Sequence, residues 1–198
     1  MKVLCVIIHT CDKYEFCWEM WYKQLTKYWI HDVKIYFVNE NKPVFFPGVE
    51  QLKTGAGEWS DRLIRALDMI DYDNVLYMQE DAWMIKPLDL GWWYHLYNIT
   101  NADAIRLFPA NDKMYKIDSD YRFANDSPYL VTHQPSIMKK AFLRACLEPG
   151  ESPWTNEIKG TKRIRGKGYS IWCGDTDKWY IGACRHGKFT DEAKELMK

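Results

Sequence analysis

The chain has 198 residues, which is the length of one domain, and a domain of this size buries roughly 70% of its unfolded surface without needing disulfides or a structural metal. Its formal net charge of +0 argues against a nucleic-acid-binding protein, because such proteins usually carry a basic excess. No stretch approaches the ~20 apolar residues of a membrane span, and the six cysteines include no Cys-x-x-Cys pair, which weakens a zinc or thioredoxin-like interpretation. We therefore expect a soluble, cytoplasmic protein, a monomer or a small homo-oligomer, that binds no nucleic acid.

The first forty residues predict a β-α-β unit. Residues 3–8 form a continuous apolar, β-branched run, which is typical of a strand buried on both faces, and residues 33–38 predict a second buried strand. Between them, residues 14–29 place bulky apolar side chains at three- and four-residue steps, as an amphipathic helix does. The crossover between the two parallel strands is expected to be right-handed.

The middle of the chain continues this alternation of strands and helices. Ser60 is a good N-cap for a helix whose apolar stripe extends to Ile70, and residues 75–78 predict a third buried strand. A helix is expected over residues 90–99 and a short strand over residues 104–108. The pattern predicts an α/β, Rossmann-like fold with a mixed, mostly parallel sheet flanked by helices.

The remaining residues are more polar and less regular. Residues 109–127 are rich in Asn and Asp, as loops are. Further elements are expected as a strand over 129–132, a helix over 137–147, strands over 169–172 and 179–181, and a polar helix from Asp191. Because no repeat, low-complexity segment or linker interrupts the chain, residues 1–198 are expected to form one domain.

An acidic pair follows the third predicted strand, in the segment Gln79-Glu80-Asp81. In open α/β sheets, ligands bind outside the carboxyl ends of the strands, and two carboxylates there can hold Mg²⁺ or Mn²⁺ while leaving coordination positions for a diphosphate. The alternative is an exposed turn in which Asp81 caps backbone amides. A second acidic pair, Asp175 and Asp177, lies in a turn-like context and is another candidate for the metal site.

Two segments that open helices are candidates for binding a nucleotide. The first junction, residues 9–13, has no Gly-x-Gly-x-x-Gly or P-loop pattern, yet its backbone and small side chains can wrap a nucleoside. Arg62 lies at the start of another helix, where free amides and a guanidinium suit an anion; a surface ion pair with Asp61 or Glu58 is the alternative. The basic cluster at residues 159–167 is either a phosphate contact or a solvated loop.

Aromatic residues make up 16% of the chain, and such rings stack on the apolar faces of sugars, although most Trp and Tyr residues fill cores. Trp154 and Trp83 lie beside polar motifs and are candidates for contact with a carbohydrate acceptor. Glu157 is a candidate general base toward a sugar hydroxyl, or simply one of the chain's many acids. His186 is either an imidazole beside the metal, a cation for a phosphate, or part of an exposed tail.

Taken in chain order, these motifs resemble the small GT-A glycosyltransferases of bacterial surface-polysaccharide loci and large DNA viruses, including a chlorella-virus domain that acts on a capsid glycan. The matching segments are HTCDKY at 9–14, KYW at 27–29, VN at 38–39, WSDRL at 59–63, QEDAW at 79–83, QPSI at 134–137 and ESPWTNE at 151–157. They span nearly the whole chain in the family's order, which makes the set more specific than any one motif. The sequence departs from the family at Glu80, where relatives often have Asp, and at Ile137, where they often have Trp.

The resemblance implies a set of donor-binding residues, namely Thr10, Cys11, Asp12, Tyr14, Asn39, Arg62, Gln79 and Glu80. It also implies Mn²⁺ or Mg²⁺ on Asp81 with Glu80 nearby, and Glu157 as the catalytic carboxylate. The expected reaction is metal-dependent transfer of a hexosyl group from a nucleotide-diphosphate donor, a UDP-sugar, to a glycan hydroxyl with inversion, in the host cytoplasm if the protein is viral. The two rival functions are a sugar-phosphate nucleotidyltransferase and a carbohydrate-binding module without turnover.

Overall fold

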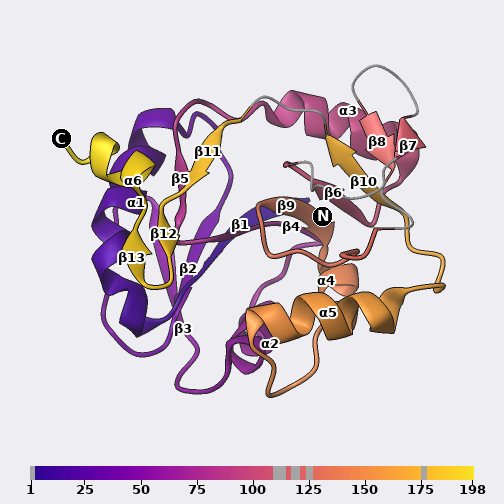
Figure 1. Cartoon of the computed structure of the whole chain (residues 1–198), viewed down its shortest axis with the longest axis horizontal. Helices are drawn as coiled ribbons and strands as arrows, with labels where there is room; N and C mark the ends of the chain where they lie inside the picture. Colours follow the sequence, from indigo (N-terminus) through magenta and orange to yellow (C-terminus); the bar gives the residue numbers. More distant parts are fainter. Residues whose placement is uncertain (1–2, 109–114, 117–120, 124–126, 175–177) are drawn as a thin grey trace.

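A computed structural model describes residues 3–108, 115–116, 121–123, 127–174 and 178–198 (Figure 1). The strands of its main sheet are, in chain order, β1 (Leu4–His9), β2 (Ile35–Asn39), β3 (Val49–Lys53), β4 (Asn74–Gln79), β6 (Ala104–Arg106), β7 (Tyr115–Lys116), β8 (Tyr121–Phe123), β9 (Ser136–Lys139) and β10 (Ile171–Gly174). Their spatial order is β3-β2-β1-β4-β9-β6-β10-β8-β7. Of these described strands, only β9 and β8 run against the others, so the sheet is mixed and mostly parallel, as predicted.

The parallel half of the sheet consists of β3, β2, β1 and β4. The three central strands are the buried runs that the sequence predicts, and residues 5–8 of β1 are 0% exposed. The edge strand β3 is not among the predicted strands, because most of its side chains are half-buried or exposed and the apolar run that marks a central strand is missing.

The predicted helix over residues 137–147 is wrong in its first part. Residues 136–139 form β9, which pairs antiparallel with β4 on one side and β6 on the other, and helix α4 (Lys140–Cys146) follows. A short buried apolar run has the same pattern in a strand as in a helix, so periodicity could not separate the two. The strand expected over residues 129–132 is also absent, although Leu130 and Val131 are buried there.

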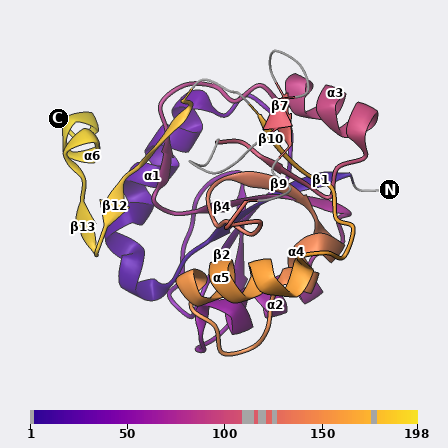
Figure 2. The same ribbon diagram turned by 45° about the vertical axis from the view of Figure 1, so that its right-hand side comes forward.

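Helices pack on both faces of the sheet, as predicted (Figures 1 and 2). Helices α1 (Glu15–Tyr28), α3 (Leu90–Thr100) and α6 (Asp191–Leu196) contribute to one apolar cluster, whereas α2 (Trp59–Met69), α4 and α5 (Pro153–Ile164) contribute to the other. Strand β1 separates the clusters, because Val6 and Ile8 belong to the first and Cys5 and Ile7 to the second.

The start of α2 differs from its prediction. Glu58, and not Ser60, is the N-cap, and Glu58 and Asp61 form a capping box. Ser60 is 0% exposed inside the first turn, where its hydroxyl accepts a hydrogen bond from the Glu151 N–H at 2.8 Å. This contact joins α2 to the segment that precedes α5.

Helix α5 is not among the predicted helices. Its N-cap is Ser152, whose hydroxyl accepts from the Thr155 N–H at 3.2 Å, and Pro153 occupies the first turn. A Ser-Pro pair of this kind is a sequence signal for the start of a helix. The helix is missing from the prediction because the segment that follows is basic and polar and has no clear apolar stripe. The basic cluster at 159–167 is the end of this helix and the turn after it, and it lines neither of the cavities described below.

Two short ladders complete the described structure. β5 (Ala82–Met84) pairs antiparallel with β11 (Tyr180–Gly182), which brings the last part of the chain beside the acidic pair, and β12 (Cys184–Arg185) pairs with β13 (Lys188–Phe189). A 3₁₀ turn, η1 (Asp12–Tyr14), joins β1 to α1. Across the described segments, no helix is long and apolar enough to cross a membrane.

Candidate active site

The carboxyl ends of three parallel strands meet at one edge of the sheet. His9 at the end of β1 is in register with Val38 of β2 and with Gln79 of β4. The segments that leave these strands therefore start side by side: η1 after β1, Glu40 after β2, and the acidic pair after β4. This edge is where ligands bind in open α/β sheets.

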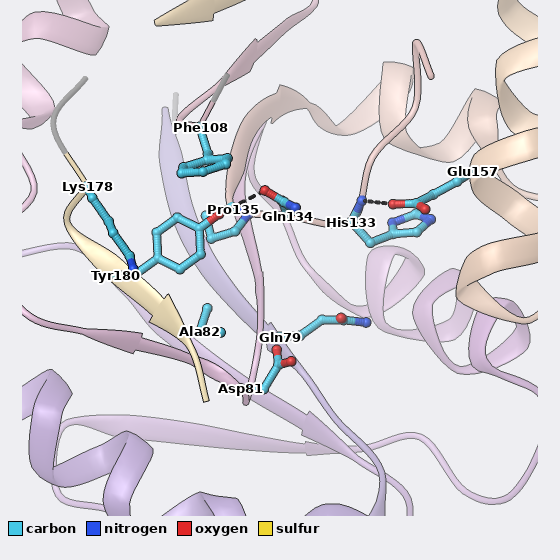
Figure 3. A pocket seen from close by; sticks show the side chains of 11 residues that line it. Gln79, Asp81, Ala82, Phe108, His133, Gln134, Pro135, Glu157, Lys178 and Tyr180 are labelled. Carbon is cyan, nitrogen blue, oxygen red and sulfur yellow. Dashed lines mark hydrogen bonds between the residues drawn. The ribbon is translucent and has the colours of Figure 1, made fainter. Parts of the chain in front are cut away.

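Two cavities open at this edge, and they share Gln79 and Asp81. The junction cavity, of about 540 Å³, is lined by His9, Thr10, Cys11, Tyr14, Trp59, Arg62, Gln79, Glu80, Asp81, Pro153, Trp154, Cys184, Arg185 and His186. The Glu157 cavity, of about 340 Å³, is lined by Gln79, Asp81, Ala82, Phe108, His133, Gln134, Pro135, Glu157, Lys178, Tyr180 and Gly182 (Figure 3). Both volumes are typical of small-molecule sites.

Glu80 and Asp81 are carboxylates in a largely buried setting. Glu80 is 6% exposed, and burial together with the neighbouring Asp81 raises its pKa to about 8. Burial also raises the pKa of Asp81 to about 6. The pair is therefore not the exposed turn that the sequence leaves open as an alternative, and a cation beside it would stabilise both ionised carboxylates.

The two carboxylates fit a divalent cation, because Mg²⁺ and similar hard ions take carboxylate oxygens and Asp81 lines both cavities. Within the described segments, no group of three or more His, Cys, Asp or Glu side chains is arranged to hold a metal ion. A cation here would thus take its other ligands from a bound diphosphate and water. The rival pair, Asp175 and Asp177, lies outside the described residues.

Arg62 is buried beneath the first junction and is 5% exposed. Its Nη1 donates to the carbonyl oxygen of Thr10, its Nε donates to the Gly57 carbonyl oxygen at 3.3 Å, and its Nε lies 3.8 Å from Glu40 Oε1. Neither alternative partner, Asp61 or Glu58, forms an ion pair with it. Arg62 therefore supports the junction backbone and places a positive charge in the wall of the junction cavity.

The expected donor-binding residues separate into two groups. Six of them line the junction cavity, namely Thr10, Cys11, Tyr14, Arg62, Gln79 and Glu80. Asp12 and Asn39 do not line it. Asn39 is 0% exposed and donates to Asp12 Oδ1 at 2.9 Å, while Asp12 Oδ2 accepts from the backbone N–H groups of Asn41 and Lys42. This hydrogen-bonded pair holds the ends of β1 and β2 together and does not face the cavity.

Neither Trp83 nor Trp154, the two tryptophans expected to contact the acceptor, lines the cavity that contains Glu157. Trp83 is 0% exposed, packs in the apolar core, and donates from Nε1 to the Glu80 carbonyl oxygen at 3.1 Å, so its ring offers no free face to a sugar. Trp154 is 72% exposed but lines the junction cavity, not the cavity that contains Glu157. All three side chains of β5 are buried in the same apolar cluster, which the position of Trp83 two residues after Asp81 could not indicate.

Glu157 lies on α5 and faces the loop before β9. Its Oε1 accepts a hydrogen bond from the His133 N–H at 2.9 Å (Figure 3). Burial raises the pKa of Glu157, and this effect is opposed by the His133 N–H, the Thr132 hydroxyl and the charge of Arg106. A carboxylate with a raised pKa is a stronger base, which suits proton abstraction near neutral pH.

Several residues of the Glu157 cavity are not in the predicted site. Phe108 and Tyr180 lie on one side of it and His133 on the other in the view of Figure 3. The Phe108 and Tyr180 rings are 5.8 Å apart, and the Tyr180 hydroxyl donates to Gln134 Oε1 at 3.0 Å. No local motif marks these residues, because tertiary contacts between distant segments bring them together.

Strand β12 and the turn that joins it to β13 complete the junction cavity. Arg185 and His186 are exposed and line it with Cys184, so His186 is at the cavity and not in a remote tail. His186 has a φ of 53°, a left-handed backbone conformation that fixes the turn of this hairpin.

Neither a protein-family model nor a curated protein matches the sequence. Solved structures do match. A 1–349 fragment of S. aureus TarS in complex with UDP-GlcNAc has a TM-score of 0.65 and 15% identity over 96% of this chain. A UDP-glucose pyrophosphorylase complexed with UDP-glucose has a TM-score of 0.57 and 9% identity, with 92% of each chain covered. A CMP:2-keto-3-deoxy-manno-octonic acid synthetase complexed with CTP has a TM-score of 0.59 and 12% identity over 99% of this chain and 97% of that chain.

The chain spans 60% of the TarS fragment and 36% of a longer TarS structure. At these identities the likeness establishes the fold, which is a Rossmann-like α/β fold, and not the reaction.

Proposed function

We propose that this chain is a metal-dependent glycosyltransferase that moves a sugar from a nucleotide-diphosphate donor, a UDP-sugar, to the hydroxyl of a glycan with inversion. The observation that carries the proposal is the pair of cavities that meet at Gln79 and Asp81. One cavity has the junction and basic residues that suit a nucleotide diphosphate, and the other has a carboxylate that suits a base. Transfer of a group from a donor to an acceptor requires a binding site for each substrate, and the two sites must adjoin.

Donor binding is assigned to the junction cavity. Its charged wall includes Arg62, and its rim includes Arg185 and His186, which can approach a diphosphate. The fold supports this assignment, since the TarS fragment was solved with UDP-GlcNAc and the pyrophosphorylase with UDP-glucose. Tyr14 and the exposed ring of Trp154 lie beside the same cavity, where a base or a sugar can stack.

Asp81 and Glu80 would hold Mn²⁺ or Mg²⁺ in this scheme. The cation would supply positive charge beside the departing nucleoside diphosphate. The role of the two carboxylates would be to hold that cation where the two cavities meet, so that the donor diphosphate would face a positive charge there in addition to those of Arg62 and Arg185.

Glu157 is assigned as the general base. The acceptor hydroxyl would lie in the Glu157 cavity and lose its proton to Glu157 as its oxygen attacks the anomeric carbon. The new carbon–oxygen bond forms on the face opposite the breaking bond to the diphosphate, so the configuration inverts. The rings of Phe108 and Tyr180 provide an apolar wall for the acceptor sugar.

A sugar-phosphate nucleotidyltransferase is the second candidate. The observation in its favour is the likeness of fold to the UDP-glucose pyrophosphorylase and to the CTP-bound synthetase, with TM-scores of 0.57 and 0.59. Against it, the first junction has no glycine-rich loop, and a base in a second cavity would have no function in that reaction. The two activities differ in the product released, which is a nucleoside diphosphate for transfer and pyrophosphate for nucleotidyl transfer.

The test is thermal melting with nucleoside diphosphates, nucleotide-sugars and nucleoside triphosphates, each with Mn²⁺, Mg²⁺ or EDTA. A ligand at a hundred times its Kd adds ~2.7 kcal/mol of stability, which gives a shift of several degrees. A metal-dependent shift with one nucleotide-sugar that disappears in Asp81→Asn supports the proposal. A shift with a triphosphate and a sugar phosphate, with release of pyrophosphate, would favour the second candidate, and binding of glycans with no response to nucleotides would indicate a carbohydrate-binding module.

A further inference from the structure

Side chains of α5 hold the loop before β9. Thr161 Oγ1 accepts from the Val131 N–H at 3.0 Å, and Asn156 Oδ1 lies 3.0 Å from His133 Nε2. Glu157 Oε1 accepts from the His133 N–H at 2.9 Å. Helix α5 therefore binds His133 twice, once through the imidazole and once through the backbone.

The contacts of Asn156 fix which nitrogen of His133 carries the proton. Asn156 Nδ2 donates to the Cys146 carbonyl oxygen at 2.8 Å and to Glu151 Oε2 at 2.7 Å. Both partners are acceptors, so the amide cannot be turned around and its Oδ1 must face His133. His133 Nε2 is consequently the protonated nitrogen that donates, and Nδ1 carries a lone pair.

His133 is kept neutral by its surroundings. It is 5% exposed, its ring lies 4.2 Å from that of Trp59 and 5.7 Å from that of Tyr77, and burial lowers its pKa to about 3. Its Nδ1 has no hydrogen-bond partner among the described atoms. Leaving an acceptor lone pair unpaired in this way is better tolerated than leaving an N–H unpaired.

Asn156 is itself anchored by a buried ion pair. Glu151 is 4% exposed and binds Arg163 through both oxygens, at 3.0 Å from Nη1 and 2.6 Å from Nη2. Arg163 Nη2 also donates to the Cys146 carbonyl oxygen at 2.8 Å. Hydrogen bonds thus link Arg163, Glu151 and Asn156 to the imidazole of His133, and the backbone N–H of the same histidine binds the carboxylate of Glu157.

We propose that Asn156 and His133 are positioning residues for the base Glu157: the imidazole bond to Asn156 fixes the backbone N–H that orients the carboxylate toward the acceptor. This inference rests on the proposed role of Glu157. It explains why a histidine beside a base is held neutral, because an imidazolium there would lower the pKa of Glu157 and weaken it as a base.

The described charged and titratable groups near Glu157 come from several elements. From β6, Arg106 lowers the pKa of Glu157, and from the loop the Thr132 hydroxyl and the His133 N–H do the same. Asp81 and Lys178 line the same cavity. If the His133 N–H moves away from Glu157, the ionised carboxylate loses one of the hydrogen bonds that stabilise it. The pKa of Glu157 should then rise further.

The test compares His133→Phe with His133→Gln. Phenylalanine keeps the packing against Trp59 and removes the bond to Asn156, whereas the amide nitrogen of glutamine can still donate to Asn156 Oδ1. His31→Phe is the matched control, because His31 contacts the Leu88 carbonyl oxygen and lines neither cavity. Each variant is assayed for kcat, for KM of donor and acceptor, and for the pH profile of transfer.

We expect His133→Phe to lower kcat about 10- to 100-fold with little change in either KM, since a small misplacement of a reacting group has an effect of this size. The acid limb of its profile should move to higher pH, and His133→Gln should recover most of the rate. Equal losses in both variants, or a wild-type rate and profile in His133→Phe, would overturn the inference. Full activity in Glu157→Gln would instead refute the role of Glu157 itself.

A measurement on the wild-type protein is independent of activity and of how the variants fold. ¹⁵N NMR of the histidine rings should show His133 neutral and protonated at Nε2 down to about pH 5. Protonation at Nδ1, or titration of His133 near its ordinary pKa, contradicts the hydrogen-bond chain.

Discussion

Replacing Arg163 by methionine measures how much the Arg163–Glu151 ion pair contributes to the free energy of unfolding. This pair anchors Asn156, which contacts His133 beside the candidate base. The guanidinium binds both oxygens of Glu151, whose side chain is 5% exposed, so the variant leaves a buried carboxylate with Asn156 Nδ2 as its remaining described side-chain donor. Removing one partner of a buried pair costs about 3–5 kcal/mol. The Arg163 side chain is 22% exposed, so water can partly replace it, and we expect about 3 kcal/mol, the lower end of that range.

Urea and thermal unfolding test this value. At about 2–4 °C per kcal/mol for a chain of this size, the melting temperature should fall by about 6–12 °C. The double variant Glu151→Gln/Arg163→Met removes both charges and should be more stable than the single variant. Lys178→Met breaks the exposed pair with Glu192 and serves as the control with little expected effect. A loss below ~1 kcal/mol in Arg163→Met, or a double variant that is less stable than the single one, would refute the reasoning.

Three further outcomes are expected. Glu157→Gln should abolish transfer while nucleotide-dependent melting shifts persist, and in the wild type the rate should fall as the pH drops through the pKa of Glu157, which burial raises above its ordinary value; product analysis and a pH–rate profile check this. Gly160→Ala places a Cβ 2.9 Å from the Cys146 carbonyl oxygen, so α5 must shift and unfolding by urea should show a loss of about 1–3 kcal/mol. Trp83→Ala should cost about 3–5 kcal/mol because its ring is fully buried, whereas Trp154→Ala should change stability little and weaken the nucleotide-dependent shift.

The sequence predicts most of the parallel half of the sheet, because buried central strands are continuous apolar runs. Residues 3–8, 33–38 and 75–78 anticipate β1, β2 and β4 to within a few residues. The errors fall where that signal is ambiguous. β9 is as apolar as a buried helix turn, and β3 at the sheet edge has little apolar character of its own.

The candidate site is predicted less completely, for a physical reason. A motif shows which side chains are near in the chain but not which way they face. Asp12 and Asn39 satisfy each other, and Trp83 turns into the core, although all three lie in motifs that the resemblance singles out. The pairing of β5 with β11, which brings Tyr180 into the Glu157 cavity, depends on contacts that no local pattern contains.

The β5–β11 ladder also has a consequence for the order of assembly. It joins segments on the order of a hundred residues apart, with only three residue pairs in register, so forming it closes a long loop for few contacts. The wall of the Glu157 cavity that carries Tyr180 should therefore join late in folding, after the β1, β2 and β4 strands have paired. For the same reason this ladder should open more readily than the nine-stranded sheet, and hydrogen exchange at Tyr180 and Ile181 should be faster than in β4. Fraying there would widen the entrance for a bulky acceptor while β4, the strand that leads into the acidic pair, stays paired with β1 and β9.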